Sequence, residues 1–205
     1  MNGTALNQID HSEAEFIGLS FSQLECAEER FADKEFDGCR FVDCDFSGTT
    51  FAHCKFLDCN FSRCNLSVAQ LEYSKFSEIE FSDCKLIGVD WTRAEWPQLA
   101  LSSSLVFRNC ILNDASFFGL QLAETVLENC KAHDLDLREA DFSESNFRGT
   151  DFSHSLFHRT NLSGTDFEDA HSFDIDVATN VIQRARFCRA EAVNLLHSLG
   201  IELVD

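Results

Sequence analysis

The sequence predicts an all-β solenoid, a rod built from short, similar coils that stack along one axis. Two observations carry this prediction. An apolar residue, most often Phe, recurs at every fifth position over most of the chain, and a column of mainly small residues stands two positions before it. A helix repeats every 3.6 residues and a flat strand every two, so neither explains a period of five. A short extended side followed by a corner does, because residues two apart in a strand share one face.

The large residues form two rows with one slip of phase between them. The first row runs at intervals of five from Phe16 to Leu101, and the second from Phe107 to Phe167. Four sides of about five residues close a square coil of about twenty, and coils pair through backbone hydrogen bonds about 4.8 Å apart. Residues twenty positions apart are therefore expected to stack. Two such stacks are Phe36, Phe56, Phe76 and Trp96 on one side, and Phe41, Phe61 and Phe81 on the next.

The alternation of large and small residues follows from the fixed width of a narrow tube. Two Phe per side would overfill the interior, and two Ala would leave cavities. The ratio of 21 Phe to one Tyr has the same origin, because a buried hydroxyl without a partner destabilises a protein by about 1–3 kcal/mol. Glu29 and Lys34 depart from the small column, so we expect an irregular first coil.

The two rows divide the chain into three parts. Residues 1–15 form an N-terminal segment, residues 16–170 form the coils, and residues 171–205 form a C-terminal cap and dimerisation segment. The phase slips near residues 102–106, shortly after Pro97, which cannot donate a hydrogen bond between coils. We interpret the slip as a tolerated insertion, in preference to a bend that shapes the rod for a partner.

The C-terminal segment is expected to close the coil stack, because solenoids need capping. The stretch from Arg189 to Leu199 has the pattern of a short helix, with Gly200 as its C-cap. Its apolar residues exceed what one end requires, which leaves two interpretations open: they only cap the end, or they also pair two chains across a two-fold axis. The candidate dimer residues are Ala192, Leu195, Leu196, Leu199, Ile201 and Leu203.

The sequence predicts neither catalysis nor cofactor binding. Eight of the ten Cys lie in the small column, and their C-x4-C spacing is the repeat period rather than the C-x2-C of a zinc site. His154 and His158 are four apart, but on a square coil they fall on adjacent sides. The sequence lacks a phosphate-binding loop and the hydrolase motifs. We expect a protein that is not an enzyme, has no metal or cofactor, and keeps free thiols in a reducing cytoplasm.

The charge balance argues against two classes of partner. The chain has 35 Asp and Glu against 16 Lys and Arg, a formal net charge of −19. Nucleic acids and anionic membranes are bound through Lys and Arg, so direct binding to either is disfavoured. No apolar run approaches the roughly 20 residues of a transmembrane helix. The first eight residues lack the features of a signal peptide, which favours a cytoplasmic location.

Many acidic residues fall at outward corners of the predicted coils, where some of them stack. The candidate partner-binding pairs are Asp58 over Glu78, Asp114 over Asp134, and Glu124 over Glu144. One explanation is solubility, since a rod filled with Phe needs charge outside. The other is mimicry. B-DNA carries about one negative charge per 1.7 Å, and a rigid acidic rod presents a similar field to a basic, DNA-binding protein.

The repeat units resemble those of a known family. Ala140–Glu144 (ADFSE) and Thr160–Gly164 (TNLSG) match the A(D/N)LXX unit of the pentapeptide repeat family. The resemblance extends over about residues 16–170, and it implies a right-handed quadrilateral β-helix.

Segments outside the regular repeat resemble the topoisomerase-protection branch of that family. These segments are Gly88–Pro97, Cys110–Leu120 and the tail from Ala185 to Leu203. The branch includes the albicidin-resistance protein, which this sequence most resembles, the microcin B17 immunity protein and the quinolone-resistance Qnr proteins.

This second resemblance implies a function. The chain would form a homodimer that mimics DNA, binds DNA gyrase, with topoisomerase IV as a second candidate, and protects it from a poison such as albicidin, a quinolone or microcin B17. A generic acidic scaffold that binds another basic protein, without resistance activity, remains the alternative, and an enzyme ranks last.

Overall fold

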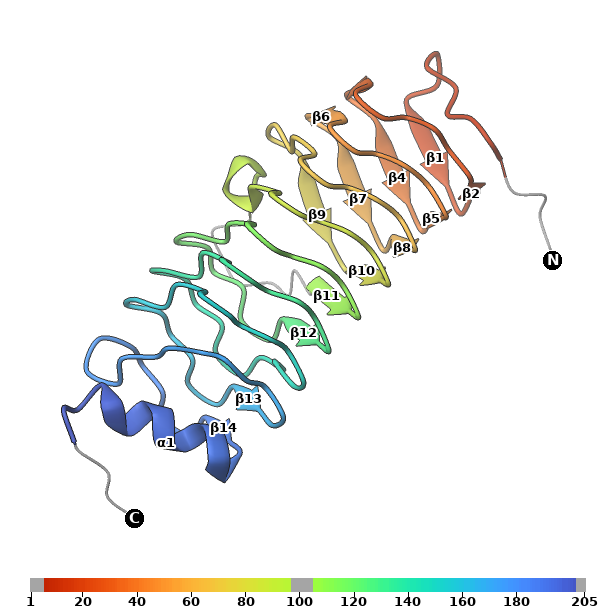
Figure 1. Cartoon of the computed structure of the whole chain (residues 1–205). Coiled ribbons are helices and arrows are strands. Elements are labelled where there is room, and N and C mark those ends of the chain that lie inside the picture. Colours follow the sequence, from red (N-terminus) through yellow and green to blue (C-terminus); the bar gives the residue numbers. More distant parts are fainter. Residues whose placement is uncertain (1–5, 97–104, 202–205) are drawn as a thin grey trace.

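The chain winds into a parallel β-solenoid of about eight turns that ends in one short helix. A computed structural model describes residues 6–96 and 105–201. Figure 1 shows the coils stacked along one axis from the N-terminal end, in red, to helix α1 (Arg189–His197), which lies beside the last coils in blue. The predicted all-β solenoid of the quadrilateral type is confirmed.

Three of the four sides carry short strands, and we call the sides A to D in chain order. Side A carries β1 (Glu15–Ile17), β4 (Glu35–Asp37), β7 (Lys55–Leu57) and β9 (Lys75–Ser77). Side B carries β2 (Ser20–Ser22), β5 (Arg40–Val42), β8 (Asn60–Ser62), β10 (Ile79–Ser82), β11 (Leu105–Arg108), β12 (Val126–Glu128), β13 (Asp166–Phe167) and β14 (Arg186–Phe187). Side D carries β3 (Arg30–Ala32), β6 (Thr50–Ala52) and the 3-10 helix η1 (Trp91–Arg93). Side C is joined by isolated parallel bridges, such as that between Asp45 and Asn65.

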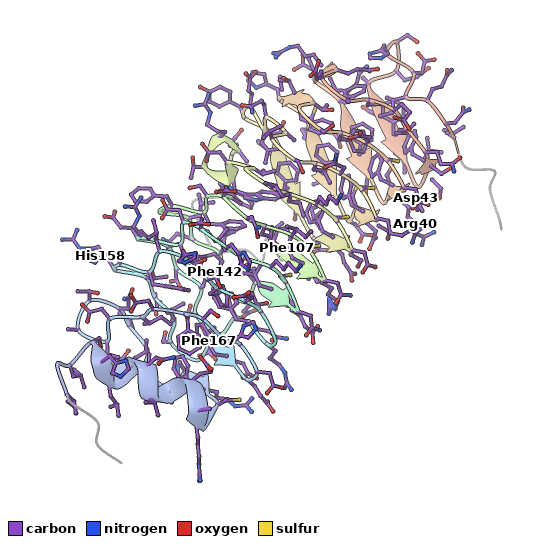
Figure 2. The ribbon with its side chains drawn as sticks, in the orientation of Figure 1. Arg40, Asp43, Phe107, Phe142, His158 and Phe167 are labelled. Atoms are coloured by element: carbon purple, nitrogen blue, oxygen red, sulfur yellow. The ribbon has the colours of Figure 1, made fainter. Side chains whose placement is uncertain are left out.

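The interior is a set of aromatic stacks in the predicted register. Phe36 pairs with Phe56 in neighbouring strands, and their ring centroids are 5.0 Å apart. The rings of Phe41 and Phe61 are 4.6 Å apart, and both pairs are nearly parallel at 10°. Trp96 departs from this pattern: its ring is half-buried and tilted by 30° against the ring of Phe76, at 6.4 Å. Figure 2 shows Phe107, Phe142 and Phe167 inside the solenoid and Arg40 and Asp43 on its outside.

The column of small residues has a second role besides filling space. The Cys59 thiol donates to the carbonyl oxygen of Phe36 at 3.4 Å, and the Thr160 hydroxyl donates to that of Leu137 at 2.9 Å. In each case the acceptor lies 23 residues earlier, in the preceding coil. Cys and Thr thus fill the same position of the column, because each supplies a small side chain with one donor.

The corners between sides have left-handed backbone conformations. Asp58 and Glu78 have φ of 48° and 56°, and the corresponding residues of most other coils are also at positive φ. Gly, Asn and Asp adopt this conformation at low cost. Val68 and Tyr73 do not, yet they have φ of 52° and 51° and side chains that are 53% and 66% exposed. Backbone strain at these two corners is therefore not offset by burial of the side chain.

The slip of phase in the sequence is one coil that is six residues longer than the others. Phe81 pairs with Phe107, 26 positions later, where other coils pair at 20. The rings of Phe81 and Phe107 are 5.2 Å apart and inclined by 7°, and Trp91 stacks on Phe117 at the same inclination. The coils therefore remain parallel across the insertion, which favours a tolerated insertion over a bend. Pro97, Leu101 and residues 102–104, which carried the prediction, lie outside the described residues.

The N-terminal segment closes the first coil, and Lys34 explains the predicted irregularity there. Its side chain is buried, and its ammonium donates to the carbonyl oxygen of His11 at 2.7 Å and to that of Glu13. The His11 ring stacks on Phe31 with the centroids 5.2 Å apart. Lys34 thus leaves the small column because its long side chain holds the segment that covers the open end.

At the other end, pairing between coils continues beyond the last regular repeat. The five-residue spacing ends at Ala170, but Asn161 bridges to Val181 and β13 pairs with β14. Helix α1 follows directly, and Gly200 has the positive φ of 67° expected of a residue after a helix end. The described residues contain no helix that is long and apolar enough to cross a bilayer.

Candidate partner-binding surface

Four of the six predicted acidic residues lie along one edge of the solenoid. We call this corner column, which follows side A, the acidic edge. It contains Asp58, Glu78, Glu124 and Glu144, all exposed, and the corner of the intervening coil lies outside the described residues. Asp114 and Asp134 are also exposed, but they lie on the diagonally opposite edge, which follows side C. The structure therefore brings four of the six together and separates the other two from them.

The carboxylates of the acidic edge are largely uncompensated. Among the described residues, Glu144 alone of the six predicted acids has an ion pair, with Arg184 at 2.9 Å. Exposed ion pairs contribute only about 0–1 kcal/mol to stability. Glu144 can therefore readily leave Arg184 for a cation of a partner. The acidic edge thus presents its negative charge to the outside.

Side B differs from the acidic edge, because its acidic side chains form ion pairs with arginines of the same side. Arg108 lies 3.5 Å from a carboxylate oxygen of Glu80 and 3.3 Å from one of Glu128. Farther along, Arg148 pairs with Glu168 at 2.9 Å and Arg186 with Asp166 at 2.8 Å. Cations and acids alternate along this side, so a cationic partner finds less net charge there than on the acidic edge.

Helix α1 leaves an apolar face exposed at the C-terminal end. Leu195 is half-buried against the core, and Ala192 is also half-buried. By contrast, Leu196, Leu199 and Ile201 are 36%, 53% and 46% exposed. Val193, which the sequence analysis did not include, is 41% exposed on the same helix, and the predicted Leu203 lies outside the described residues. One helix face thus covers the last coils, and the other is unpartnered in the single chain.

The cysteines are arranged for packing. Nine are buried and Cys188 is half-buried, and the described residues hold no cluster of three His, Cys, Asp or Glu that could bind a metal ion. Burial raises the pKa of the Cys26 thiol to about 12. A hydrogen bond with Cys110 raises the pKa of Cys84 to about 12. Both thiols are therefore neutral at pH 7, a state in which they are poor nucleophiles and poor metal ligands.

This arrangement predicts that one of the ten thiols reacts rapidly in the folded protein. With Ellman's reagent at pH 8, we expect Cys188 to react first and the other nine only after denaturation. A Cys188→Ser variant should show no rapid phase. If several thiols of the native protein reacted rapidly with the reagent, the result would contradict the packing described above.

The largest aromatic stacks leave little empty space between them, and His154 and His158 do not come together. The cavity between Phe51 and Trp91 has a volume of about 10 Å³, about enough for one water molecule. His154 and His158 are both exposed and lie on different faces of their coil, and Figure 2 shows His158 directed away from the rod.

The fold and this surface define a class of protein: a four-sided solenoid of five-residue repeats, with an apolar interior and a charged exterior. Residues 34–106 and 89–167 match the family profile described as "Pentapeptide repeat region". The chain therefore belongs to the pentapeptide repeat family, as the sequence units indicated.

Solved structures of one member of this family are similar to the chain over nearly its whole length. A trypsin-treated form of QnrB1, described as a plasmid-mediated fluoroquinolone resistance protein, matches with a TM-score of 0.65 and 24% identity, over 93% of this chain and 92% of that one. Full-length QnrB1 matches with a TM-score of 0.58 and 25% identity, over 89% and 100%. The quinolone-resistance Qnr proteins are among those that the sequence resembles. A sequence search of curated proteins finds no match.

Proposed function

We propose that this protein binds DNA gyrase, or topoisomerase IV as a second candidate, and protects it from a poison by presenting a surface that resembles DNA. The observation that carries the proposal is the acidic edge, where four exposed carboxylates, of which Glu144 alone has an ion pair, follow a rigid rod. The likeness to the fluoroquinolone resistance protein QnrB1 supports the same function.

The physical basis is a match of charge pattern. Coils are spaced about 4.8 Å apart, and B-DNA has about one negative charge per 1.7 Å when both strands are counted. The acidic edge does not reach that density, because it has at most one carboxylate per coil, but acids on the opposite edge, such as Asp114 and Asp134, increase the field along the rod. A cleft lined with Lys and Arg attracts such a rod and accelerates its binding.

A homodimer fits this role. Leu196, Leu199 and Ile201 would be covered when two helices α1 pair around a two-fold axis, which joins two rods end to end. The doubled rod would span more of a DNA-binding groove than one chain does. The likeness to solved structures concerns single chains, so the dimer is part of the proposal.

The mechanism requires binding without catalysis. The rod would occupy the place of the DNA segment that is to be cleaved, or contact the complex of enzyme, DNA and drug, and so exclude the poison. It needs no cofactor and makes no direct contact with nucleic acid. Its affinity has to be moderate, because a rod that never dissociates would itself inhibit the enzyme. The cytoplasm is where such a target is found.

Rescue of supercoiling tests this function. Purified gyrase is assayed with albicidin, a quinolone or microcin B17, each with and without the protein. We expect low micromolar protein to restore supercoiling against at least one poison, and an equal concentration of albumin to restore none. Binding of gyrase without rescue would favour the generic acidic scaffold. Absence of both rescue and binding at low salt would exclude the proposed function.

A further inference from the structure

Side A carries an unusual pair of cations. Lys55 and Lys75 stand directly opposite each other in neighbouring strands β7 and β9, and theirs is the one pair of cations among the register pairs of the described residues. Like charges in this arrangement repel each other across a sheet. Each ammonium has an acidic neighbour, Glu35 at 2.8 Å from Lys55 and Glu95 at 3.2 Å from Lys75. Both lysine side chains nevertheless remain about half exposed, at 50% and 51%.

These two lysines line a surface groove together with two aromatic rings. The groove has a volume of about 170 Å³ and is formed by His53, Cys54, Lys55, Tyr73, Lys75 and Glu95. The Tyr73 ring stacks on His53 with the centroids 5.4 Å apart and the planes inclined by 12°. Tyr73 is 66% exposed at a corner with φ of 51°, so it is held in a strained backbone without a burial gain. Tyr is also a residue type that often dominates the binding energy of protein interfaces.

The groove and the acidic edge lie on the two margins of the same side. In each of these two coils, the acidic corner residue follows the lysine by three positions, Asp58 after Lys55 and Glu78 after Lys75. Three extended residues span about 10 Å. Side A therefore presents a strip of two half-exposed lysines, their two acidic partners and two aromatic rings beside the acidic edge.

We infer that the groove receives a segment bearing a carboxylate from the same protein partner whose basic surface meets the acidic edge. This inference rests on the proposed function and identifies side A, at β7 and β9, as the docking face. Charge complementarity favours a protein segment over DNA, because Glu35, Glu95, Asp58 and Glu78 surround the lysines and would repel a continuous phosphate backbone. An isolated carboxylate on a protein loop meets these acids at one point only, whereas a phosphate backbone meets them at every phosphate along its path.

Replacing the two groove lysines by neutral residues distinguishes binding at the groove from simple attraction between an acidic rod and a basic protein. The double variant Lys55→Gln, Lys75→Gln makes the net charge more negative by two, so simple attraction predicts tighter binding to gyrase. The groove predicts at least fivefold weaker binding. The matched control is Lys85→Gln, Lys131→Gln, which changes the charge equally at two exposed lysines on side C. We expect the control to bind as tightly as the unmodified protein, or more tightly.

Tyr73→Asn provides a readout that a folding defect would not produce. Asn adopts positive φ more easily than Tyr, so the variant should melt at the same temperature or higher. Its affinity for gyrase should nevertheless fall at least fivefold. A stable variant with unchanged affinity would overturn the role of Tyr73 in the groove.

The outcomes distinguish the inference from the proposed function. If the unmodified protein binds gyrase and the Lys55→Gln, Lys75→Gln variant binds as well as its control, the groove is wrong while the proposed function stands. If the unmodified protein does not bind gyrase at low salt, the proposed function fails and the inference fails with it. Binding of a duplex DNA oligonucleotide that depends on Lys55 and Lys75 would assign the groove to phosphate and overturn its assignment to a protein carboxylate.

Discussion

Neutralising the acidic edge is expected to weaken gyrase binding at least tenfold and to abolish protection. The variant is Asp58→Asn, Glu78→Gln and Glu124→Gln together. The three side chains are exposed and, among the described residues, have no ion pair, so their removal leaves no cation unpaired. Amides tolerate the left-handed corners, as Gln23 does at φ of 54°. The fold should therefore be retained, which a thermal melt checks.

The expected loss arises from the field that the edge presents to a basic groove. A tenfold loss of affinity corresponds to about 1.4 kcal/mol, or under half a kcal/mol for each carboxylate. Most of the effect should be on the association rate and should shrink as salt is added, since charges about a Debye length apart are screened. Stopped-flow measurements at two salt concentrations test both statements.

A matched variant on side B separates the edge from the total charge. Glu80→Gln, Glu128→Gln and Glu168→Gln also remove three negative charges, but from acids that already pair with Arg108, Arg148 or Arg186. We expect this control to retain most of the affinity and to protect gyrase. Equal losses in both variants would show that net charge alone matters, and that the acidic edge has no special role.

The second large effect is expected at the C-terminal end, where Leu196→Asp should convert a dimer into monomers. Leu196 is 36% exposed on α1, next to the exposed Leu199 and Ile201. In a two-fold symmetric dimer each chain contributes its own Asp at this position, so two carboxylates would be buried near each other in the interface. We expect the dimer dissociation constant to rise at least a hundredfold, about 2.7 kcal/mol. Light scattering over a dilution series measures the change.

Val181→Asp is the control for the dimer. Val181 is 42% exposed but lies in the column of Asn161, outside helix α1. This variant should remain a dimer, because its carboxylate stays in water. If Leu196→Asp scatters light as the unmodified protein does, the C-terminal interface is refuted.

The period of the sequence was sufficient to predict the solenoid, because a coil repeats one local solution many times. Side-chain stacking at intervals of twenty, as for Phe36 on Phe56, follows from counting alone. The period does not reveal the backbone conformation of the corners or the hydrogen bonds made by individual side chains. The pattern does not reveal that corner residues such as Val68 are left-handed, because residues of many types occupy the corners. Nor does it reveal the thiol donors, because Cys59 satisfies the pattern by size alone.

The candidate site was harder to predict for a specific reason. A phase shift in a five-residue repeat is the same for one extra residue and for six, so the sequence alone does not give the length of the long coil. Glu78 and Glu124 share an edge only when that coil has 26 residues. The sequence therefore identified outward acids correctly, but it did not show that Asp58, Glu78, Glu124 and Glu144 form one line. The groove at Tyr73 was missed, because lysines that stand opposite each other are visible only once the register is known.

The uniform register of the coils also has a consequence for how such a gene changes. Each coil away from the long one corresponds to twenty codons, and the residues that it contacts lie one period before and after it. Deleting or duplicating twenty codons would shorten or lengthen the rod by about 4.8 Å and keep each column in place. The length of the rod can thus change in steps of one coil, to match the span of a target, without any new side chain.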